Sequence, residues 1–158
     1  MPEEVNIKKE YESLKKKYKE LPDFEKIDNE FELTTIEKSD FLARRIRRKV
    51  GEKVVFFCRI LENIIYPSMQ NAMGVYEAGF FSDDEKEKLT KIHRELMSLE
   101  RSSLLLEVEC RDEEEDIVYI KTTFEKWFDF KKEIIEIVTK MKEVWKKEVK
   151  EDNEKYFG

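Results

Sequence analysis

The stretch "VGEKVVFFCRILENII" occupies residues 50–65 of this 158-residue chain, and its spacing of apolar residues decides the fold class. Large apolar side chains recur every three or four residues, in a stripe that begins upstream: Leu42, Ile46, Val50, Val54, Phe57, Leu61 and Ile64. An α-helix turns by about 100° per residue, so this spacing places the whole stripe on one face of a helix. Arg59 and Glu62 interrupt the apolar run well before membrane-spanning length. The stretch therefore predicts an amphipathic helix, and we expect no membrane partner.

The same spacing returns in the rest of the chain. Four more stripes have this spacing, two before residues 42–64 and two after them: Ile7, Tyr11, Leu14, Tyr18 and Leu21; Phe24, Ile27 and Phe31; Leu89, Ile92, Leu96, Leu99 and Leu106; and Ile120, Phe124, Trp127, Ile134, Val138, Met141 and Trp145. With only four Gly and three Pro, the chain favours a few long elements over a turn-rich β-sandwich. Short connections between long helices make neighbouring helices antiparallel. We therefore predict an all-α fold, an antiparallel up-and-down bundle of about four helices: three long helices and an N-terminal helical arm.

Capping residues and helix breakers predict where the first long helix begins and ends. Thr34 and Glu37 have the spacing of a capping box, in which each side chain bonds the backbone N–H of the other residue. We expect the helix to start there and to run to Met73, with a kink at Pro67 because proline removes one backbone donor. Residues 74–79, bracketed by two glycines, are predicted to form a loop.

A second capping box predicts the start of the next long helix. Ser82 and Glu85 have the required spacing, and we expect the helix that follows to fade within the acidic run at residues 111–116. The last helical region should contain a break near "WFDF", residues 127–130, and should end near Lys150.

Length and composition predict a single domain over residues 1–158. With 40% hydrophobic residues the chain can build one core but is short for two. We assign residues 1–33 to the N-terminal arm, 34–150 to the bundle core and 151–158 to a frayed tail. The N-terminus lacks the apolar core of a signal peptide, so we expect a cytoplasmic protein. Abundant Lys and Glu with a single Gln resemble the surface composition of thermophilic proteins.

The stretch "ARRIRRK", residues 43–49, concentrates positive charge in a chain of net charge -6. Its basic residues are a candidate patch for nucleic acid or for ion pairs: Arg44, Arg45, Arg47, Arg48 and Lys49. On a helix they spread over about 200°, nearly opposite the apolar stripe, and should face solvent or a neighbouring helix edge. Glu52 follows Arg48 by four residues on the same side. Acidic residues thus interrupt the basic face, which disfavours a continuous track for phosphates.

A helical hairpin would bring this basic cluster to an acidic one. If the two helices turn back near residue 78, Arg44 lies near Asp112 and Lys49 lies near Glu107. Residues 44–53 carry six positive charges and one negative, whereas residues 107–116 carry seven negative and one positive. Opposite charges within a Debye length of about 8 to 10 Å largely cancel. We therefore expect an intramolecular ion-pair network, with nucleic acid or a protein partner as alternatives and a divalent-metal site disfavoured.

Histidine and cysteine usage predicts no metal, cofactor or nucleophile. His93 is the only histidine, which excludes sites built on paired histidines. Cys58 and Cys110 lack CxxC spacing and are expected to be reduced, structural thiols. We expect no cofactor, no metal and no catalytic residue.

The nearest pattern to an enzyme motif is "EIIE", residues 133–136. All-α nucleotide pyrophosphohydrolases hold magnesium with similarly spaced carboxylates on bundle helices. Glu136, however, lies about 200° from Ile134 on the helical wheel and so faces away from the core. A magnesium-dependent hydrolase is therefore the third of three functional hypotheses, and we expect the protein not to be an enzyme.

The apolar residues near the 74–79 loop are a candidate interaction surface: Met69, Met73, Tyr76, Phe80 and Phe81. They either cap the bundle core or contact a protein, because Met and aromatic side chains are enriched at interface centres. We interpret the chain as a non-enzymatic helical protein-interaction or scaffold module. The main alternative is a nucleic-acid-binding helical protein that uses residues 44–49. A slender bundle leaves much apolar area exposed, so we also expect a homodimer.

Overall fold

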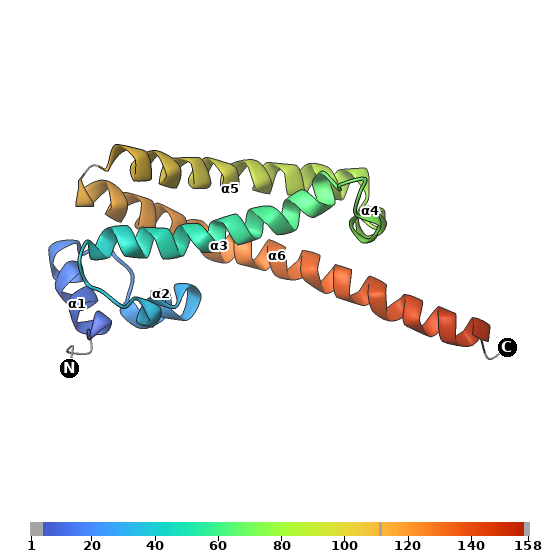
Figure 1. The fold of residues 1–158 in the computed structure, drawn as a ribbon, viewed down its shortest axis with the longest axis horizontal. Coiled ribbons are helices and arrows are strands. Elements are labelled where there is room, and N and C mark those ends of the chain that lie inside the picture. The colour runs from blue at the N-terminus through green and yellow to red at the C-terminus, as the bar shows by residue number, and fades with distance from the viewer. Residues whose placement is uncertain (1–4, 111, 157–158) are drawn as a thin grey trace. The chain divides into compact units, whose positions relative to one another are not determined.

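A computed structural model describes residues 5–110 and 112–156, and every regular element in that part of the chain is a helix (Figure 1). The elements in chain order are α1 (Ile7–Lys17), α2 (Phe24–Phe31), the 3-10 turn η1 (Leu33–Thr35), α3 (Leu42–Ile65), α4 (Ala72–Ala78), α5 (Asp83–Glu109) and α6 (Glu113–Tyr156). The all-α fold class is confirmed, while the topology of a bundle of about four helices stays a prediction. Over the described residues, no helix combines the length and the apolar character that crossing a bilayer requires.

The chain divides into two compact units. Unit 1 comprises Met1–Phe56 and Leu96–Trp127, and unit 2 comprises Phe57–Glu95 and Phe128–Gly158. Each of the three long helices, α3, α5 and α6, contributes one part to each unit.

Unit 1 has a core in which the N-terminal arm packs against the first half of α6. Tyr11 of α1 packs on Phe24 of α2, with ring centroids 5.4 Å apart. Phe31 packs on Trp127 at 4.7 Å, and the Trp127 indole N–H donates to Glu30 at 2.7 Å. Aromatic pairs contribute about 0.5–1.5 kcal/mol beyond their area burial. These contacts attach α2 to α6 although about a hundred residues separate them in sequence.

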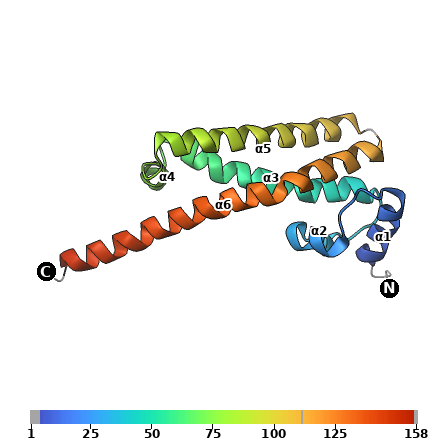
Figure 2. The ribbon, with the colours of Figure 1, turned by 180° about the vertical axis from the view of Figure 1, so that it is seen from behind.

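The remainder of the unit 1 core is supplied by the unit 1 parts of α3, α5 and α6, which run side by side in both views (Figures 1 and 2). Buried side chains from these helices are Leu42, Ile46, Val50, Val54, Leu96, Ile117 and Ile120. Gly51 lets α3 approach α5 closely, because a Cβ at that position would lie 3.3 Å from the Ser103 hydroxyl oxygen.

Unit 2 is built from the second part of α3, α4, the first part of α5 and the second part of α6. Its buried residues are Phe57, Cys58, Leu61, Ile64, Ala78, Phe81, Leu89, His93, Phe130, Ile134 and Ile137. The capping box predicted at the start of α5 is confirmed: Ser82 N–H donates to Glu85 at 2.7 Å, and Glu85 N–H donates to Ser82 at 3.2 Å. Glu85 also accepts from Lys140 of α6 at 2.7 Å.

The predicted start of the first long helix at Thr34 is wrong, because α3 begins at Leu42. Thr34 belongs to η1, and its backbone N–H donates to the Asp28 carboxylate at 2.8 Å. Thr35 likewise donates its hydroxyl proton to the Glu32 carbonyl at 2.7 Å. Both threonines therefore form hydrogen bonds with α2 or with its C-cap residue, Glu32, and neither caps α3.

The predicted continuation of that helix to Met73, and the loop after it, are also wrong. Helix α3 ends at Ile65, since a residue that precedes proline is disfavoured in the helical conformation. Pro67 thus terminates the helix instead of kinking it. The predicted loop at residues 74–79 is largely helical, because Asn71 accepts from the Gly74 N–H at 3.2 Å and caps α4.

The acidic run and the predicted break also behave differently from expectation. Residues 113–116 form the first turn of α6 instead of ending α5, and carboxylates are favourable at a helix N-terminus. The predicted break at residues 127–130 is absent from α6, since Trp127 and Phe130 lie three positions apart and are both buried. Helix α6 reaches Tyr156, past the expected end at Lys150, while residues 157 and 158 of the predicted tail lie outside the described residues.

Candidate functional site

Arg47 is the centre of a buried charge cluster in unit 1. Its side chain is 1% exposed, and its Nε donates to Asp116 at 2.5 Å. Its Nη2 donates to Glu107 at 2.6 Å, and its Nη1 donates to the Ser103 carbonyl and hydroxyl oxygens at 3.0 and 2.9 Å. Of the two surroundings expected for the basic cluster, solvent or a neighbouring helix edge, Arg47 has the second, because it contacts α5 and α6 and is buried between them and α3. A buried guanidinium requires such a set of acceptors, because desolvation of an uncompensated charge costs several kcal/mol.

Arg48 shares the Glu107 carboxylate with Arg47. Its Nη2 and Nε donate to the two carboxylate oxygens at 2.6 and 3.1 Å. Hydrogen bonds from Arg48 and then from Arg47 lower the pKa of Glu107 to about 2. A hairpin that turns near residue 78 predicts Lys49 beside Glu107, whereas the observed partner of Glu107 is the preceding residue, Arg48. The structure thus brings the predicted basic and acidic clusters together through Arg47 and Arg48.

The other three residues of the basic patch have different surroundings. The Arg44 guanidinium lies 5.1 Å from the Phe41 ring centroid, and Arg45 Nε donates to the Asp40 backbone carbonyl at 2.7 Å. Within the described residues, none of Arg44, Arg45 and Lys49 forms an ion pair with a carboxylate. Arg44 lies near Asp112, as predicted, because both line one cavity, but the two form no ion pair within the described residues. The patch therefore has a neutralised part and a part that keeps its charge.

The acidic run divides in the same way. Glu113 accepts from Lys17 at 2.8 Å and from the Tyr18 hydroxyl at 3.0 Å, and the Lys17 hydrogen bond lowers the pKa of Glu113. Three other carboxylates of the run form no ion pair within the described part of the chain: Asp112, Glu114 and Glu115. Glu115 Oε2 is buried and has no hydrogen-bond partner among the described residues. Such an atom is costly until a donor reaches it.

An apolar groove lies between α5 and α6 in unit 1, and we refer to it as the α5–α6 groove. It has a volume of about 330 Å³ and is lined by Leu99, Ser102, Leu105, Leu106, Glu115, Val118, Tyr119 and Thr122. Two of its large apolar side chains are exposed: Leu105 is 56% exposed and Val118 is 61% exposed. Leu104, which is 50% exposed, lines a different cavity with Arg47 and Gly51. Glu115, with its unpartnered oxygen, lies at the end nearest the turn between the two helices.

This groove was not predicted from the sequence, although the signal is present. Leu106 belongs to the predicted core stripe, whereas Leu104, Leu105 and Val108 belong to no predicted stripe. Three consecutive leucines followed by Val108 spread apolar side chains over about 200° of the last turns of α5. This face is wider than the stripe of about 100° that typically packs on a core, so it requires a second covering surface.

The apolar residues predicted as an interaction surface lie in unit 2 and fall into two groups. Met69, Met73 and Phe80 are 89%, 64% and 42% exposed. Phe81 is 6% exposed, with the Lys140 ammonium 4.7 Å from its ring centroid, and therefore belongs to the core. Tyr76 is half-buried and packs on Phe80 and Trp145, with ring centroids 5.0 and 5.3 Å away. Only part of the predicted set is thus available to a partner.

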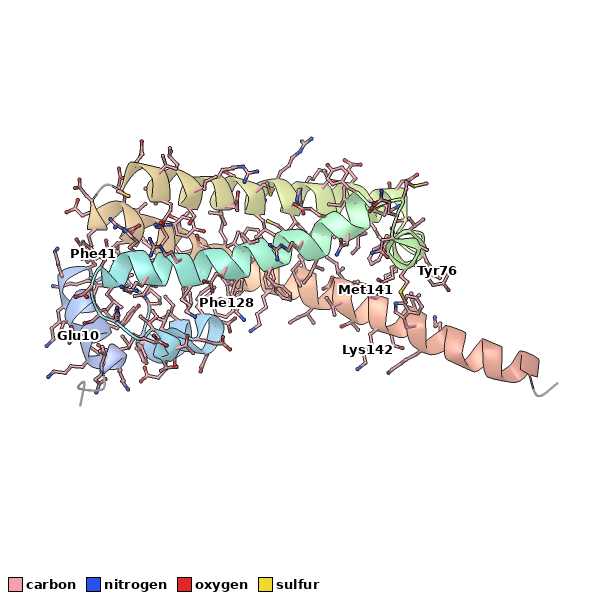
Figure 3. All side chains as sticks on the ribbon, in the orientation of Figure 1. Glu10, Phe41, Tyr76, Phe128, Met141 and Lys142 are labelled. Carbon is pink, nitrogen blue, oxygen red and sulfur yellow. The ribbon has the colours of Figure 1, made fainter. Side chains whose placement is uncertain are left out.

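An exposed apolar stripe runs along residues 128–142 of α6 in unit 2, and we call this exposed face the α6 stripe. Phe128, Ile135 and Val138 are 49%, 55% and 43% exposed, so Val138 is not the core residue that its position in the predicted stripe implied. Met141 lies on the side of α6 that faces α4, and Lys142 lies on the opposite side (Figure 3).

The residues weighed for catalysis are engaged in other contacts. Glu133 pairs with Lys88 at 2.7 Å, and Glu136 is exposed. His93 is buried, and its Nε2 lies 3.1 Å from Glu62. Over residues 5–110 and 112–156, no group of three or more His, Cys, Asp or Glu side chains is arranged to hold a metal ion.

Comparison with protein-family models, with curated proteins and with solved structures finds no match to this chain.

Proposed function

We propose that this protein is a non-enzymatic helical interaction module whose docking site is the α5–α6 groove of unit 1. The observation that carries the proposal is the exposure of Leu105 and Val118 on the two helices that line one apolar groove. A groove between antiparallel helices accepts the apolar face of a third helix, one of the recurring modes of peptide recognition.

The energetics favour a covered groove. Full burial of one Leu or Val side chain stabilises a complex by about 1.5–3 kcal/mol relative to leaving it in water. Of the residues that line the groove, Leu105 and Val118 are each more than half exposed. Contiguous apolar patches of more than a few hundred Å² are unusual on monomeric proteins and mark interaction sites. The cost of the exposed patch is recovered only when a partner covers it.

Site-specific photo-crosslinking tests this function. A benzophenone side chain replacing Leu105 should form a discrete adduct with a protein partner in a lysate of the native organism. The matched control carries the same group at Lys91, which lies on α5 in unit 2 and whose side chain is 72% exposed. Equal adduct patterns from positions 105 and 91, or no adduct from position 105, would refute the proposed docking site.

A second candidate, nucleic-acid binding, is favoured by the unneutralised part of the basic patch. Arg45 and Lys49 lie four residues apart on α3 and form no ion pair within the described residues, while Arg47 and Arg48 are engaged with carboxylates. Affinity that depends on phosphate contacts falls steeply with salt.

The test of this candidate leaves Arg47 and Arg48 intact because they neutralise carboxylates inside unit 1. Replacement Lys49→Glu should lower the slope of log affinity against log salt by about 1. Lys91→Glu, the same charge change on α5, should leave the slope unchanged. No binding of single- or double-stranded nucleic acid at low salt would eliminate the candidate.

A further inference from the structure

The identity of the occupant is constrained by the charge at one end of the α5–α6 groove. The floor is apolar, but the end nearest the helix turn carries Glu115, and Glu114 precedes it in the first turn of α6. Neither carboxylate forms an ion pair within the described residues. Within residues 5–110 and 112–156, no hydrogen-bond donor reaches the buried Glu115 Oε2. An occupant that complements this groove therefore combines an apolar stripe with Lys or Arg side chains at its edge.

The chain itself contains a segment of that chemistry, the α6 stripe. At about 100° per residue, Phe128, Ile135, Val138 and Lys142 fall within about 80° on the helical wheel. Asp129, Glu133 and Glu136, the acidic residues of this segment, fall on the other side of the helix. Lys132 and Lys142 are exposed and form no ion pair within the described part of the chain. The α6 stripe is thus an exposed, basic amphipathic helix face.

The two surfaces have similar lengths. The groove is lined over residues 99–106 of α5 and 115–122 of α6, which at a rise of 1.5 Å per residue corresponds to about 10 Å of helix. The apolar part of the α6 stripe, Phe128 to Val138, spans about 15 Å by the same rise. The basic Lys142 therefore extends one turn past the apolar part and can reach a carboxylate at the groove end.

The segment that fills the groove has to come from another molecule. Helix α6 is continuous from Glu113 to Tyr156, so its residues 128–142 cannot fold back onto the first turns of the same helix. We propose that the α5–α6 groove of one copy binds the α6 stripe of a second copy, with Lys142 or Lys132 of one chain paired to Glu114 or Glu115 of the other. This inference rests on the proposed docking function of the groove and specifies its partner.

Complementary charge reversal tests the pairing. The groove variant carries Glu114→Lys and Glu115→Lys, and the stripe variant carries Lys132→Glu and Lys142→Glu. Each variant alone places like charges opposite each other across the interface. Light scattering at tens of micromolar should therefore give a mass near the 19.2 kDa of one chain. Wild type should give at least twice that mass. In an equimolar mixture of the two variants, opposite charges again face each other across the interface, so the mixture should recover the wild-type mass.

The mixture separates a lost interface from a lost fold, since an unfolded variant cannot be rescued by its counterpart. Circular dichroism of each variant should match wild type. A single-chain mass for wild type at hundreds of micromolar, or variants that retain the larger mass, would overturn the inference. So would a mixture that stays at the single-chain mass.

Two further measurements locate the interface and separate this inference from the proposed function. Met69→Glu, at the most exposed methionine of the predicted loop-end surface, should leave the larger mass unchanged. Dissociation by Met69→Glu instead would place the contact at that surface and overturn the proposal. A crosslink from position 105 to an unrelated protein, together with a single-chain mass, would overturn self-pairing while keeping the docking function of the groove.

Discussion

Ion pairs in the two units use the same side-chain chemistry in different surroundings. In unit 1, Arg47 and Asp116 are joined at 2.5 Å with side chains that are 1% and 8% exposed. In unit 2, Lys88 and Glu133 are joined at 2.7 Å with side chains that are 58% and 26% exposed. Water can solvate the charges of the second pair but not those of the first. Loss of one partner should therefore lower the free energy of unfolding much more for the buried pair than for the exposed pair, although the two distances are similar. Burial, more than distance, decides what each pair contributes.

The largest expected effect follows from removing one partner of the buried pair. Arg47→Met leaves Asp116 buried without its cation and should reduce the free energy of unfolding by about 3–5 kcal/mol. Lys88→Met in unit 2 should reduce it by less than about 1 kcal/mol. Denaturant titration followed by circular dichroism measures both. Equal losses for the two variants would show that the difference in burial does not matter.

A double replacement sharpens the same comparison. Arg47→Met combined with Asp116→Leu removes both buried charges, so the free energy of unfolding should recover by several kcal/mol relative to Arg47→Met alone. This outcome would assign the loss in the single variant to the stranded carboxylate. A double variant as unstable as the single one would instead assign it to the contacts of Arg47 with Ser103 and Glu107.

An intermediate effect is expected in acid. The pKa of Glu107 is lowered to about 2, first by the hydrogen bond from Arg48 and then by that from Arg47. A folded-state pKa below the unfolded value of about 4.3 stabilises the fold above that value, and the contribution is lost as pH falls toward 2. Because the Glu107 side chain is 40% exposed, solvent screening limits the contribution to about 1 kcal/mol. Glu107→Gln should therefore unfold with a weaker pH dependence between pH 5 and pH 2, measured by denaturant midpoints.

The smallest expected effect concerns salt. The Lys140–Glu85 pair of unit 2 has side chains 36% and 44% exposed, so a salt concentration of about 1 M should screen it. Lys140→Met should then cost less in high salt than in low salt, with a difference of about 0.5 kcal/mol. The loss caused by Arg47→Met should not change with salt. Equal salt sensitivity of the two variants would mean that the Arg47 cluster is accessible to ions.

Much of this arrangement could be predicted from local sequence rules. The spacing of Val50, Phe57 and Leu61 predicted a helix, and all three side chains are buried in α3. The Ser82 and Glu85 spacing predicted a helix start that the structure contains. These features depend only on residues a few positions apart, for which helical geometry is the same in any protein.

Other local rules failed where two rules competed. Thr34 has a capping-box partner in sequence, yet its N–H is bound to Asp28 and helix α3 begins eight residues later. Gly74 suggested a loop, but the Asn71 cap outweighs the helix cost of glycine, about 1 kcal/mol. Sequence patterns such as capping boxes and glycines carry no free energies, so they do not show which of two competing patterns prevails.

Periodicity, capping residues and charge counts predicted the helical class, the start of α5 and the meeting of the 44–53 and 107–116 clusters, within one residue of the observed Arg48–Glu107 pair. Three further features depend on how the helices pack against one another: Arg47 is buried, Phe81 belongs to the core while Phe80 is exposed, and Leu105 and Val118 line an open groove. The helical wheel of one helix shows which residues share a face, but burial depends on how many other helices cover that face. Arg47 is buried because carboxylates from both α5 and α6 converge on it, and that convergence is a property of the assembled fold.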